Sequence, residues 1–211
     1  MRLPLALLIA LTASPVLAEG ERAGDFDYYV MSLSWSPNWC AMTGDARADP
    51  QCDTRHDFSF TLHGLWPQYE SGWPSWCHTS ERDPTRSETA AMADIMGGSG
   101  LAWYEWQKHG RCTGLSAQQF FAASRQAYES IVIPKVFQNL DRDVRLPASV
   151  VEDAFLEVNG ALQQDMITIT CKQGMIQEVR ICLTKELALR PCAADTLRDC
   201  QLPNAYMGAV R

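Results

Sequence analysis

Runs of apolar residues predict two β-strands in the first third of the chain. The stretch from Phe26 to Trp35 is rich in β-forming residues and predicts a buried strand, which the following Ser-Pro pair ends. From Phe58, apolar and polar residues alternate strictly as far as His63. This alternation predicts that His63 ends a strand on its polar side, just before Gly64 turns the chain.

Helices and a hairpin are predicted further along. Residues 166–171 and 175–184 are β-rich and are separated by Lys-Gln-Gly, which indicates a hairpin. Helical spacing and end signals predict helices over residues 85–96, 101–112, 116–133 and 147–160. In the last of these, Val150, Val151 and Val158 are expected to face inward. With no internal repeat or linker, the chain is expected to form a single α+β domain with a central antiparallel sheet packed against several helices.

The segment LAWYEWQKHGRC, residues 101–112, separates polar from aromatic side chains around a predicted helix. At about 100° per residue, Trp103 and Trp106 share one arc, and we expect both to be buried. The opposite arc carries the side chains that can do chemistry, namely Leu101, Glu105, Lys108 and His109. Taken alone, Glu105 and Lys108 would be a surface ion pair worth less than ~1 kcal/mol.

Residues 1–18 have the pattern of a secretory signal peptide. Arg2 is their only charged residue, an apolar run follows it, and small residues precede the expected cleavage after Ala18. The apolar run is too short to span a bilayer. We therefore expect residues 19–211 to form one exported domain with no membrane segment.

The charge balance argues against broad, non-specific binding of nucleic acid. Lys and Arg number 18 against 25 Asp and Glu, and loss of Arg2 leaves a formal charge of −8. Because an acidic protein repels polyanions, a polyanionic substrate would have to be held by a local cluster of residues.

Eight cysteines lie in the exported part, and their even number predicts four disulfides in an oxidising compartment. Eight cysteines allow 105 pairings, and the spacing alone does not choose among them. A zinc site is disfavoured because no C-x-x-C pair occurs. A nucleophilic cysteine is disfavoured because every thiol is expected to have a partner.

Two stretches hold most of the groups suited to acid–base chemistry. His63 lies beside Trp66 in one of them, and Glu105, Lys108 and His109 lie in the other. Two imidazoles can act as base and acid on opposite sides of one bond, and a nearby lysine can neutralise a charged phosphorane. RNA is the matching substrate, because its 2′-hydroxyl is an internal nucleophile that needs only a base, and its leaving 5′-oxygen needs only an acid.

These two stretches, TLHGLWP from Thr61 and EWQKHG from Glu105, closely resemble the two active-site segments of the ribonuclease T2 family. Both occur in the family's order, and the cysteine-rich C-terminal part with its ITITC and EVRIC strands is also similar. The resemblance covers most of the exported chain. It implies a ribonuclease T2-like fold and an endoribonuclease that needs no metal or cofactor.

The resemblance also implies a role for each matching residue. His109 matches the general base that acts on the 2′-hydroxyl, and His63 matches the acid that protonates the 5′-oxygen. Glu105 and Lys108 match the pair that stabilises the phosphorane, and Trp66 matches an aromatic that stacks on the base 5′ to the cut. The products would be a 2′,3′-cyclic phosphate and then a 3′-phosphate, with low base specificity.

One position departs from the family pattern, and another leaves the specificity open. Tyr104 stands where members usually carry a third, phosphate-binding histidine, and a phenol can donate a hydrogen bond but brings no positive charge. Gln68 stands where acidic or amide residues are common, which leaves the base preference open. We expect Gln68, Tyr104 and Leu101 to contact substrate, although packing is an alternative role for Leu101.

The family's disulfides imply the pairs Cys40 with Cys52, Cys77 with Cys112, Cys171 with Cys200, and Cys182 with Cys192. The second pair would hold His63 and His109 in one site. The protein is expected to be a periplasmic or extracellular monomer whose partner is RNA. Two other functions remain open: an RNA-binding or protein-interaction module without activity, and a metallohydrolase that uses His63, His109 and Glu105.

Overall fold

The computed structural model describes residues 21–211, so the signal peptide expected over residues 1–18 lies outside the described residues. Six strands form one sheet in the order β2-β1-β5-β6-β3, and β4 pairs with β5. Their ladders are antiparallel except for one parallel contact between β5 and β6. The strands are β1 Tyr28–Trp35, β2 Phe60–Gln68, β3 Val144–Leu146, β4 Ile167–Lys172, β5 Met175–Leu183 and β6 Ala205–Met207.

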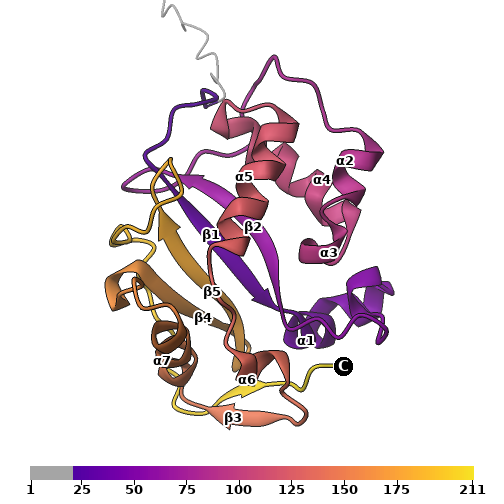
Figure 1. Ribbon diagram of the computed structural model, residues 1–211, viewed down its shortest axis with the longest axis vertical. Coiled ribbons are helices and arrows are strands. Elements are labelled where there is room, and N and C mark those ends of the chain that lie inside the picture. Colours follow the sequence, from indigo (N-terminus) through magenta and orange to yellow (C-terminus); the bar gives the residue numbers. More distant parts are fainter. Residues whose placement is uncertain (1–20) are drawn as a thin grey trace, which may run out of the picture.

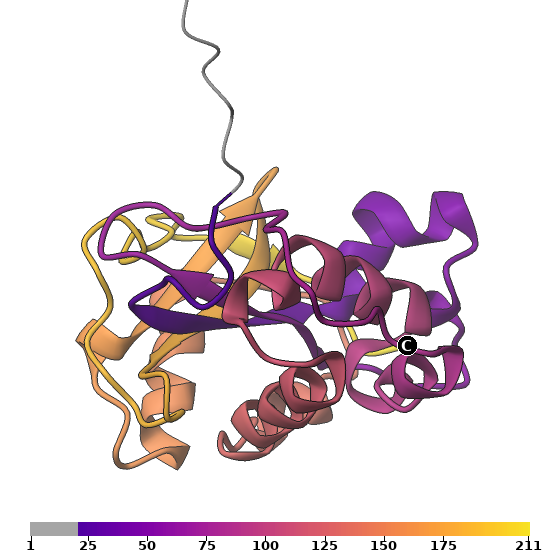
Figure 2. The same cartoon turned by 90° about the horizontal axis from the view of Figure 1, so that it is seen from above.

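Seven α-helices accompany this sheet among the described residues. They are α1 Ser36–Trp39, α2 Arg86–Ala90, α3 Ala93–Met96, α4 Ser99–Lys108, α5 Ala117–Glu129, α6 Lys135–Gln138 and α7 Ala148–Val158. Helices α2 to α5 gather beside β1 and β2, and α7 lies beside β4 (Figure 1). Seen from above, the orange strands lie at one end and the magenta helices α2 to α4 lie toward the other, where the chain also reaches its C-terminus (Figure 2). The α+β fold predicted from the sequence is confirmed.

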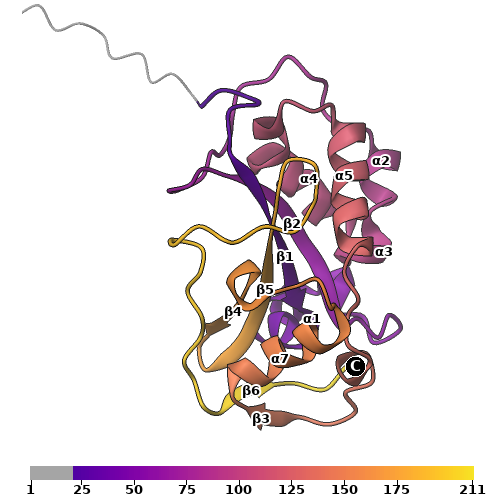
Figure 3. The ribbon, with the colours of Figure 1, turned by 60° about the vertical axis from the view of Figure 1, so that its left-hand side comes forward.

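The two faces of the sheet differ in chemistry because successive side chains of a strand point to opposite faces. On one face, Leu33 of β1, Val179 of β5 and Ile169 of β4 lie side by side in the main hydrophobic core. On the other face, Ser34 lies beside Glu178, and both are buried. Figure 3 shows α2 to α5 on one side of β1 and β2 and the yellow loop after β5 on the other.

The local signals explain where the helices begin. Thr85 and Glu88 form a reciprocal capping box before α2, and Ser116 forms another before α5. The helix predicted over residues 85–96 is divided into α2 and α3, and the one predicted over 116–133 ends at Glu129. The hairpin of β4 and β5 is confirmed, and Gln173 and Gly174 both have positive φ at its turn.

Three predictions of burial were wrong. Helix α4 buries Ala102 and Trp106, four residues apart, and this stripe turns Trp103 toward solvent. Helix α7 buries Val151 but exposes Val150, which lies one position and 100° away around the helix, and it exposes Val158 at its last position.

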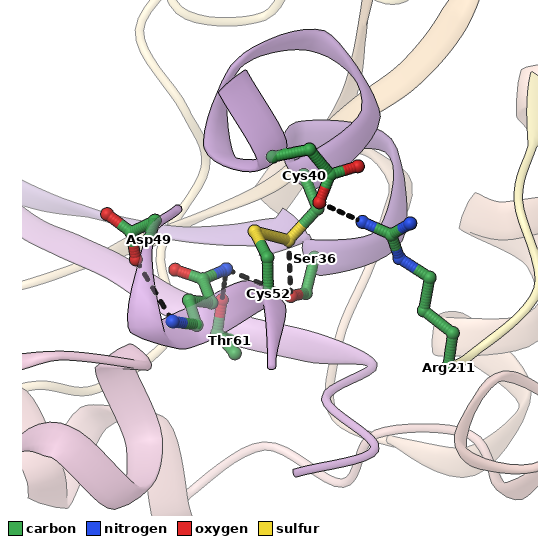
Figure 4. The surroundings of a disulfide bond; sticks show 8 residues. Ser36, Cys40, Asp49, Cys52, Thr61 and Arg211 are labelled. Carbon is green, nitrogen blue, oxygen red and sulfur yellow. Dashed lines mark hydrogen bonds and ion pairs between the residues drawn. A yellow bond between two sulfur atoms is a disulfide. The ribbon is translucent and has the colours of Figure 1, made fainter. Parts of the chain in front are cut away.

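Four disulfides join the described cysteines in the pairs that the family resemblance implied: Cys40–Cys52, Cys77–Cys112, Cys171–Cys200 and Cys182–Cys192. Figure 4 shows the first of them beside Ser36 and Thr61, with Arg211 on its other side. The Gln51 amide next to this disulfide donates hydrogen bonds to both hydroxyls, at 3.0 and 3.3 Å. The disulfide therefore closes the turn-rich segment 40–52 on itself, and Gln51 fastens this segment to the start of β2 through Thr61.

Across residues 21–211, no helix has both the length and the apolar character that crossing a bilayer requires.

Candidate active site

A β-bulge at His63 sets the geometry of the first motif. Strand β2 does not end at His63 as predicted, because it continues through Gly64 to Gln68. Ser32 pairs with Gly64 and Leu33 pairs with Leu62, so His63 is the extra residue opposite β1. The extra residue shifts by one position the alternation of side chains between the two faces of the sheet.

This change of phase puts two functional side chains on one face. His63 and Trp66 are three residues apart, and in a regular strand they would point to opposite faces. With the bulge both line one cavity, and their rings meet edge to face with centroids 5.2 Å apart. The sequence predicted which residues were involved but not the bulge that makes them neighbours.

His63 has an anionic partner that the sequence did not reveal. Its Nδ1 lies 2.6 Å from Glu178 Oε1, and the Glu178 side chain is only 1% exposed. The second oxygen of Glu178 accepts two hydrogen bonds from the guanidinium of Arg180, at 2.9 and 2.7 Å. Burial lowers the pKa of His63, but the Glu178 carboxylate outweighs it, and the net shift is upward. Burial likewise raises the pKa of Glu178, but His63 and Arg180 together lower it to about 2.

Glu105 is held beneath the same face by the first motif. Its Oε2 accepts a hydrogen bond from the Trp66 indole N–H at 2.7 Å, and its Oε1 lies 3.8 Å from His63 Nε2. Burial raises the pKa of Glu105 to about 7 against the opposing effect of His63. Gly64 makes this approach possible, because a Cβ there would lie 2.0 Å from Glu105 Oε2. Glu105 is therefore a buried group and not the solvated end of a surface ion pair.

His109 lies at the end of α4 and is almost fully buried. Its ring is tilted by 30° against that of Trp66, with centroids 5.4 Å apart, and its Nδ1 has no hydrogen-bond partner. Burial lowers the pKa of His109 to about 3, and the positive charges of Lys108 and His63 act in the same direction. His109 is thus neutral at the pH at which His63 is protonated.

Tyr104 and Lys108 form the solvent side of the site. The Lys108 ammonium lies 5.7 Å from the centre of the Tyr104 ring, and Trp76 packs against that ring edge to face. Tyr104 lies where two cavities meet.

The first cavity, of about 380 Å³, contains most of the groups expected from the sequence, namely His63, Trp66, Gln68, Tyr104, Glu105, Lys108 and His109. The second, of about 670 Å³, also contains His63 and Tyr104 and is lined further by Leu101. The Gln68 side chain is largely buried and donates a hydrogen bond to the carbonyl of Pro67. The two cavities share His63 and Tyr104 and therefore form one groove, in which His109 lines the first cavity.

Sequence reasoning missed the contribution of the C-terminal half of the chain. Glu178 and Arg180 lie two residues apart on β5, and Asp195 and Thr196 come from the loop that follows it. The EVRIC segment contained the signal for the first two, because alternation places its Glu and Arg on one face. Only the pairing of β5 with β1 shows that this face is the one carrying His63.

The site is not arranged as a cluster of metal ligands. Among residues 21–211, the one group of three candidate ligand atoms within 4.8 Å of one another is that of Cys40, Asp45 and Cys52. Their disulfide leaves neither cysteine a thiolate with which to bind a metal.

His63 and His109 line one cavity together with Lys108 and the buried carboxylate of Glu105, and the pKa of His63 is raised while that of His109 is lowered. Two imidazoles shifted in opposite directions are suited to acid–base chemistry. Residues 26–192 match the model of the ribonuclease T2 family. The chain is 35% identical over 201 residues to a ribonuclease of Aeromonas hydrophila, covering 94% of this chain and 90% of that protein. The chain belongs to the ribonuclease T2 family and is an endoribonuclease of that type.

Solved structures show the same fold. An RNase-related protein from Calystegia sepium superposes with a TM-score of 0.66 at 20% identity, covering 88% of this chain and 98% of that one. RNase NT in complex with 5′-AMP superposes with a TM-score of 0.61 at 22% identity, again covering 88% and 98%.

Proposed function

We propose that this ribonuclease cleaves single-stranded RNA by metal-independent transesterification, with His109 as general base and His63 as general acid. One observation carries the proposal: the two imidazoles line one cavity, and His63 is in contact with the Glu178 carboxylate whereas His109 is buried without a charged partner at Nδ1. Burial keeps His109 neutral and able to accept a proton, and Glu178 keeps His63 charged and able to donate one.

In the first step, His109 removes the proton of the 2′-hydroxyl while the 2′-oxygen forms a bond to phosphorus. The bond from phosphorus to the 5′-oxygen breaks, and that oxygen takes a proton from Nε2 of His63. The products are a 2′,3′-cyclic phosphate and a free 5′-hydroxyl. In a slower second step, the two histidines exchange roles, and water opens the ring to a 3′-phosphate.

Lys108 and Glu105 act on the phosphorane in this scheme. The Lys108 ammonium supplies positive charge at the edge of the groove. Glu105, whose pKa burial raises to about 7, can donate or accept a hydrogen bond near neutral pH. The negative charge of the bound phosphodiester raises the pKa of His109. His109 is therefore a stronger base when substrate is bound.

Low base specificity forms part of the proposal. The wall of the first cavity includes the flat rings of Trp66 and Trp73, and every base has a π-face that can stack on such a surface. Gln68, the expected reader of base edges, has its amide engaged with the backbone. Leu101 offers an apolar contact in the second cavity.

We also propose that the enzyme acts in the periplasm or outside the cell as a monomer. The signal peptide pattern of residues 1–18 and the four disulfides support this location, because disulfides persist in oxidising compartments.

Incubation of the purified protein with RNA in EDTA tests the function. We expect cleavage that leaves 2′,3′-cyclic phosphate ends, and no cleavage at a single 2′-deoxy substitution, because the nucleophile is then missing. Activity that EDTA abolishes and a divalent metal restores would indicate the metallohydrolase. RNA binding without cleavage would indicate a binding module.

A further inference from the structure

Exposed aromatic side chains are concentrated beside the groove. Among residues 21–211, the large aromatic side chains that are more than a third exposed are Trp73 at 58%, Trp76 at 51%, Tyr104 at 42% and Trp103 at 38%. All four come from two short segments, the loop before α2 and the middle of α4. Scattered exposed apolar residues need no explanation, but a group of them at one place indicates a binding surface.

The backbone at Trp76 is anchored to the C-terminal end of α4 and the turn that follows it. Its backbone N–H donates to the Lys108 carbonyl at 2.8 Å, and the next residue forms the Cys77–Cys112 disulfide. Trp76 also has a φ of +55°, which is unfavourable for a bulky side chain and persists only where surrounding structure imposes it. These constraints hold the half-exposed Trp76 side chain where it can contact a ligand outside the protein core.

Trp76 and Tyr104 pack against each other edge to face, so a base can stack on one ring while the other supports it. Their ring centroids are 5.8 Å apart with an interplanar angle of 81°. Tyr104 lines both cavities, whereas Trp76 is among the lining residues of neither. The pair therefore begins at the centre of the groove and extends beyond its rim.

We propose that Trp76, held edge to face against the Tyr104 ring, is a stacking platform for a base of single-stranded RNA outside the two nucleotides joined by the cleaved phosphate. The identity of the ligand rests on the proposed function. The two cavities take the nucleosides that flank the cleaved phosphate, so a base on Trp76 belongs to a further nucleotide. Lys108, 5.7 Å from the Tyr104 ring, supplies the positive charge that a neighbouring phosphate requires.

The platform gives Tyr104 a role that differs from that of the histidine usual at this position. Stacking needs the ring of Tyr104 and not its hydroxyl, whereas a hydrogen bond to phosphate needs the hydroxyl. Tyr104→Phe and Tyr104→Ala therefore separate the two roles. The phenylalanine variant retains the platform and the alanine variant removes it.

Binding of oligo-2′-deoxyadenylates of two and eight nucleotides tests the platform, because these probes cannot be cleaved. Fluorescence anisotropy of labelled probes gives Kd at fixed salt. We expect Trp76→Ala and Tyr104→Ala to weaken binding of the octamer by roughly 5- to 150-fold, the range for loss of one stacked base. The ratio of the dimer Kd to the octamer Kd should fall in both variants, and Tyr104→Phe should match the wild type.

Trp103→Ala is the matched control, since Trp103 is an exposed tryptophan that lines neither cavity. An equal octamer Kd in Trp76→Ala and wild type would overturn the proposal, as would an equal loss in Trp103→Ala. A loss in Tyr104→Phe as large as in Tyr104→Ala would assign Tyr104 to the phosphate and remove it from the platform. Binding of these probes requires no cleavage, so the two proposals are tested separately. The platform proposal can be wrong while RNA is still cut to cyclic phosphates, and it can be right while the cleavage proposal is wrong.

Discussion

The carboxylate of Glu178 lies 2.6 Å from Nδ1 of His63, and the guanidinium of Arg180 binds its other oxygen. An anionic acceptor at Nδ1 keeps the proton on that nitrogen and fixes the orientation of the ring. Nε2 is then the nitrogen left to protonate a leaving group. Glu178 is, on this geometry, a positioning residue for the proposed acid.

Glu178→Gln is expected to move the alkaline limb of the kcat/KM profile to lower pH. The amide preserves the shape but removes the charge and leaves only one accepting oxygen, so only the Glu105 carboxylate still opposes the burial that lowers the pKa of His63. Activity at neutral pH should fall mainly in kcat. The pH dependence of kcat/KM, together with NMR titration of His63, measures the effect.

Glu186→Gln, at an exposed position on the loop after β5, is the control and should leave the profile unchanged. An unchanged alkaline limb in Glu178→Gln, with His63 still titrating as in the wild type, would remove Glu178 from the mechanism.

The wild-type kcat/KM profile should be a broad bell. The base must be neutral, so the acid limb follows the pKa of His109, which burial lowers to about 3. The acid must be protonated, so the alkaline limb follows the raised pKa of His63. Activity should therefore stay high across pH 5 to 7, decline at more acidic pH as His109 becomes protonated, and decline at more alkaline pH as His63 loses its proton.

Glu105, whose pKa burial raises to about 7, titrates inside this interval. Glu105→Gln should remove any inflection there while lowering kcat. A profile that rises continuously to alkaline pH would contradict the assignment of His63 as acid.

Gly64→Ala, in strand β2, is expected to displace the side chains of Glu105 and Trp66 in the site. A Cβ at this position would lie 2.0 Å from Glu105 Oε2 and 2.3 Å from Trp66 Nε1, so their hydrogen bond cannot survive unchanged. We expect a loss of about 1–3 kcal/mol in the free energy of unfolding. We also expect kcat/KM to fall by about 100-fold, the cost of misplacing a catalytic group by ~1 Å.

Gly160→Ala, after α7, is the matched control, because no atom lies within 4 Å of the added Cβ and Gly160 lines neither cavity. It should leave both stability and kcat/KM close to those of the wild type. Denaturant unfolding and steady-state kinetics measure both variants. Wild-type activity in Gly64→Ala would mean that the Glu105–Trp66 contact is dispensable.

Removing the Cys77–Cys112 disulfide should affect substrate binding as well as stability. This bridge joins the loop that carries Trp76 to the turn just after His109. Replacing both cysteines by serine should lower the free energy of unfolding by about 2–5 kcal/mol. KM for RNA should also rise, because the loop is no longer fixed against α4.

The Cys171–Cys200 bridge supplies the comparison, because neither of its cysteines lines the groove. Its double serine variant should lose stability with KM unchanged. The kinetics are measured at a temperature at which both variants are fully folded. An equal change of KM in the two variants would indicate a general loss of stability.

The sequence by itself determined the two motifs, the even number of cysteines and the main strands. These features depend on local chemistry: the order of residues in His63–Trp66 and Glu105–His109, the β-rich hairpin, and the capping signals at Thr85 and Ser116. A short-range pattern of this kind is visible in one dimension because the interacting residues are near each other in the chain.

Only the tertiary structure decided how these groups work. The bulge that brings His63 and Trp66 to one face arises from the register of β2 on β1. The partner of His63 comes from a strand 115 positions away in the chain. The opposite pKa shifts of His63 and His109 depend on burial and on neighbouring charges, and both are properties of the packed fold that no local pattern records.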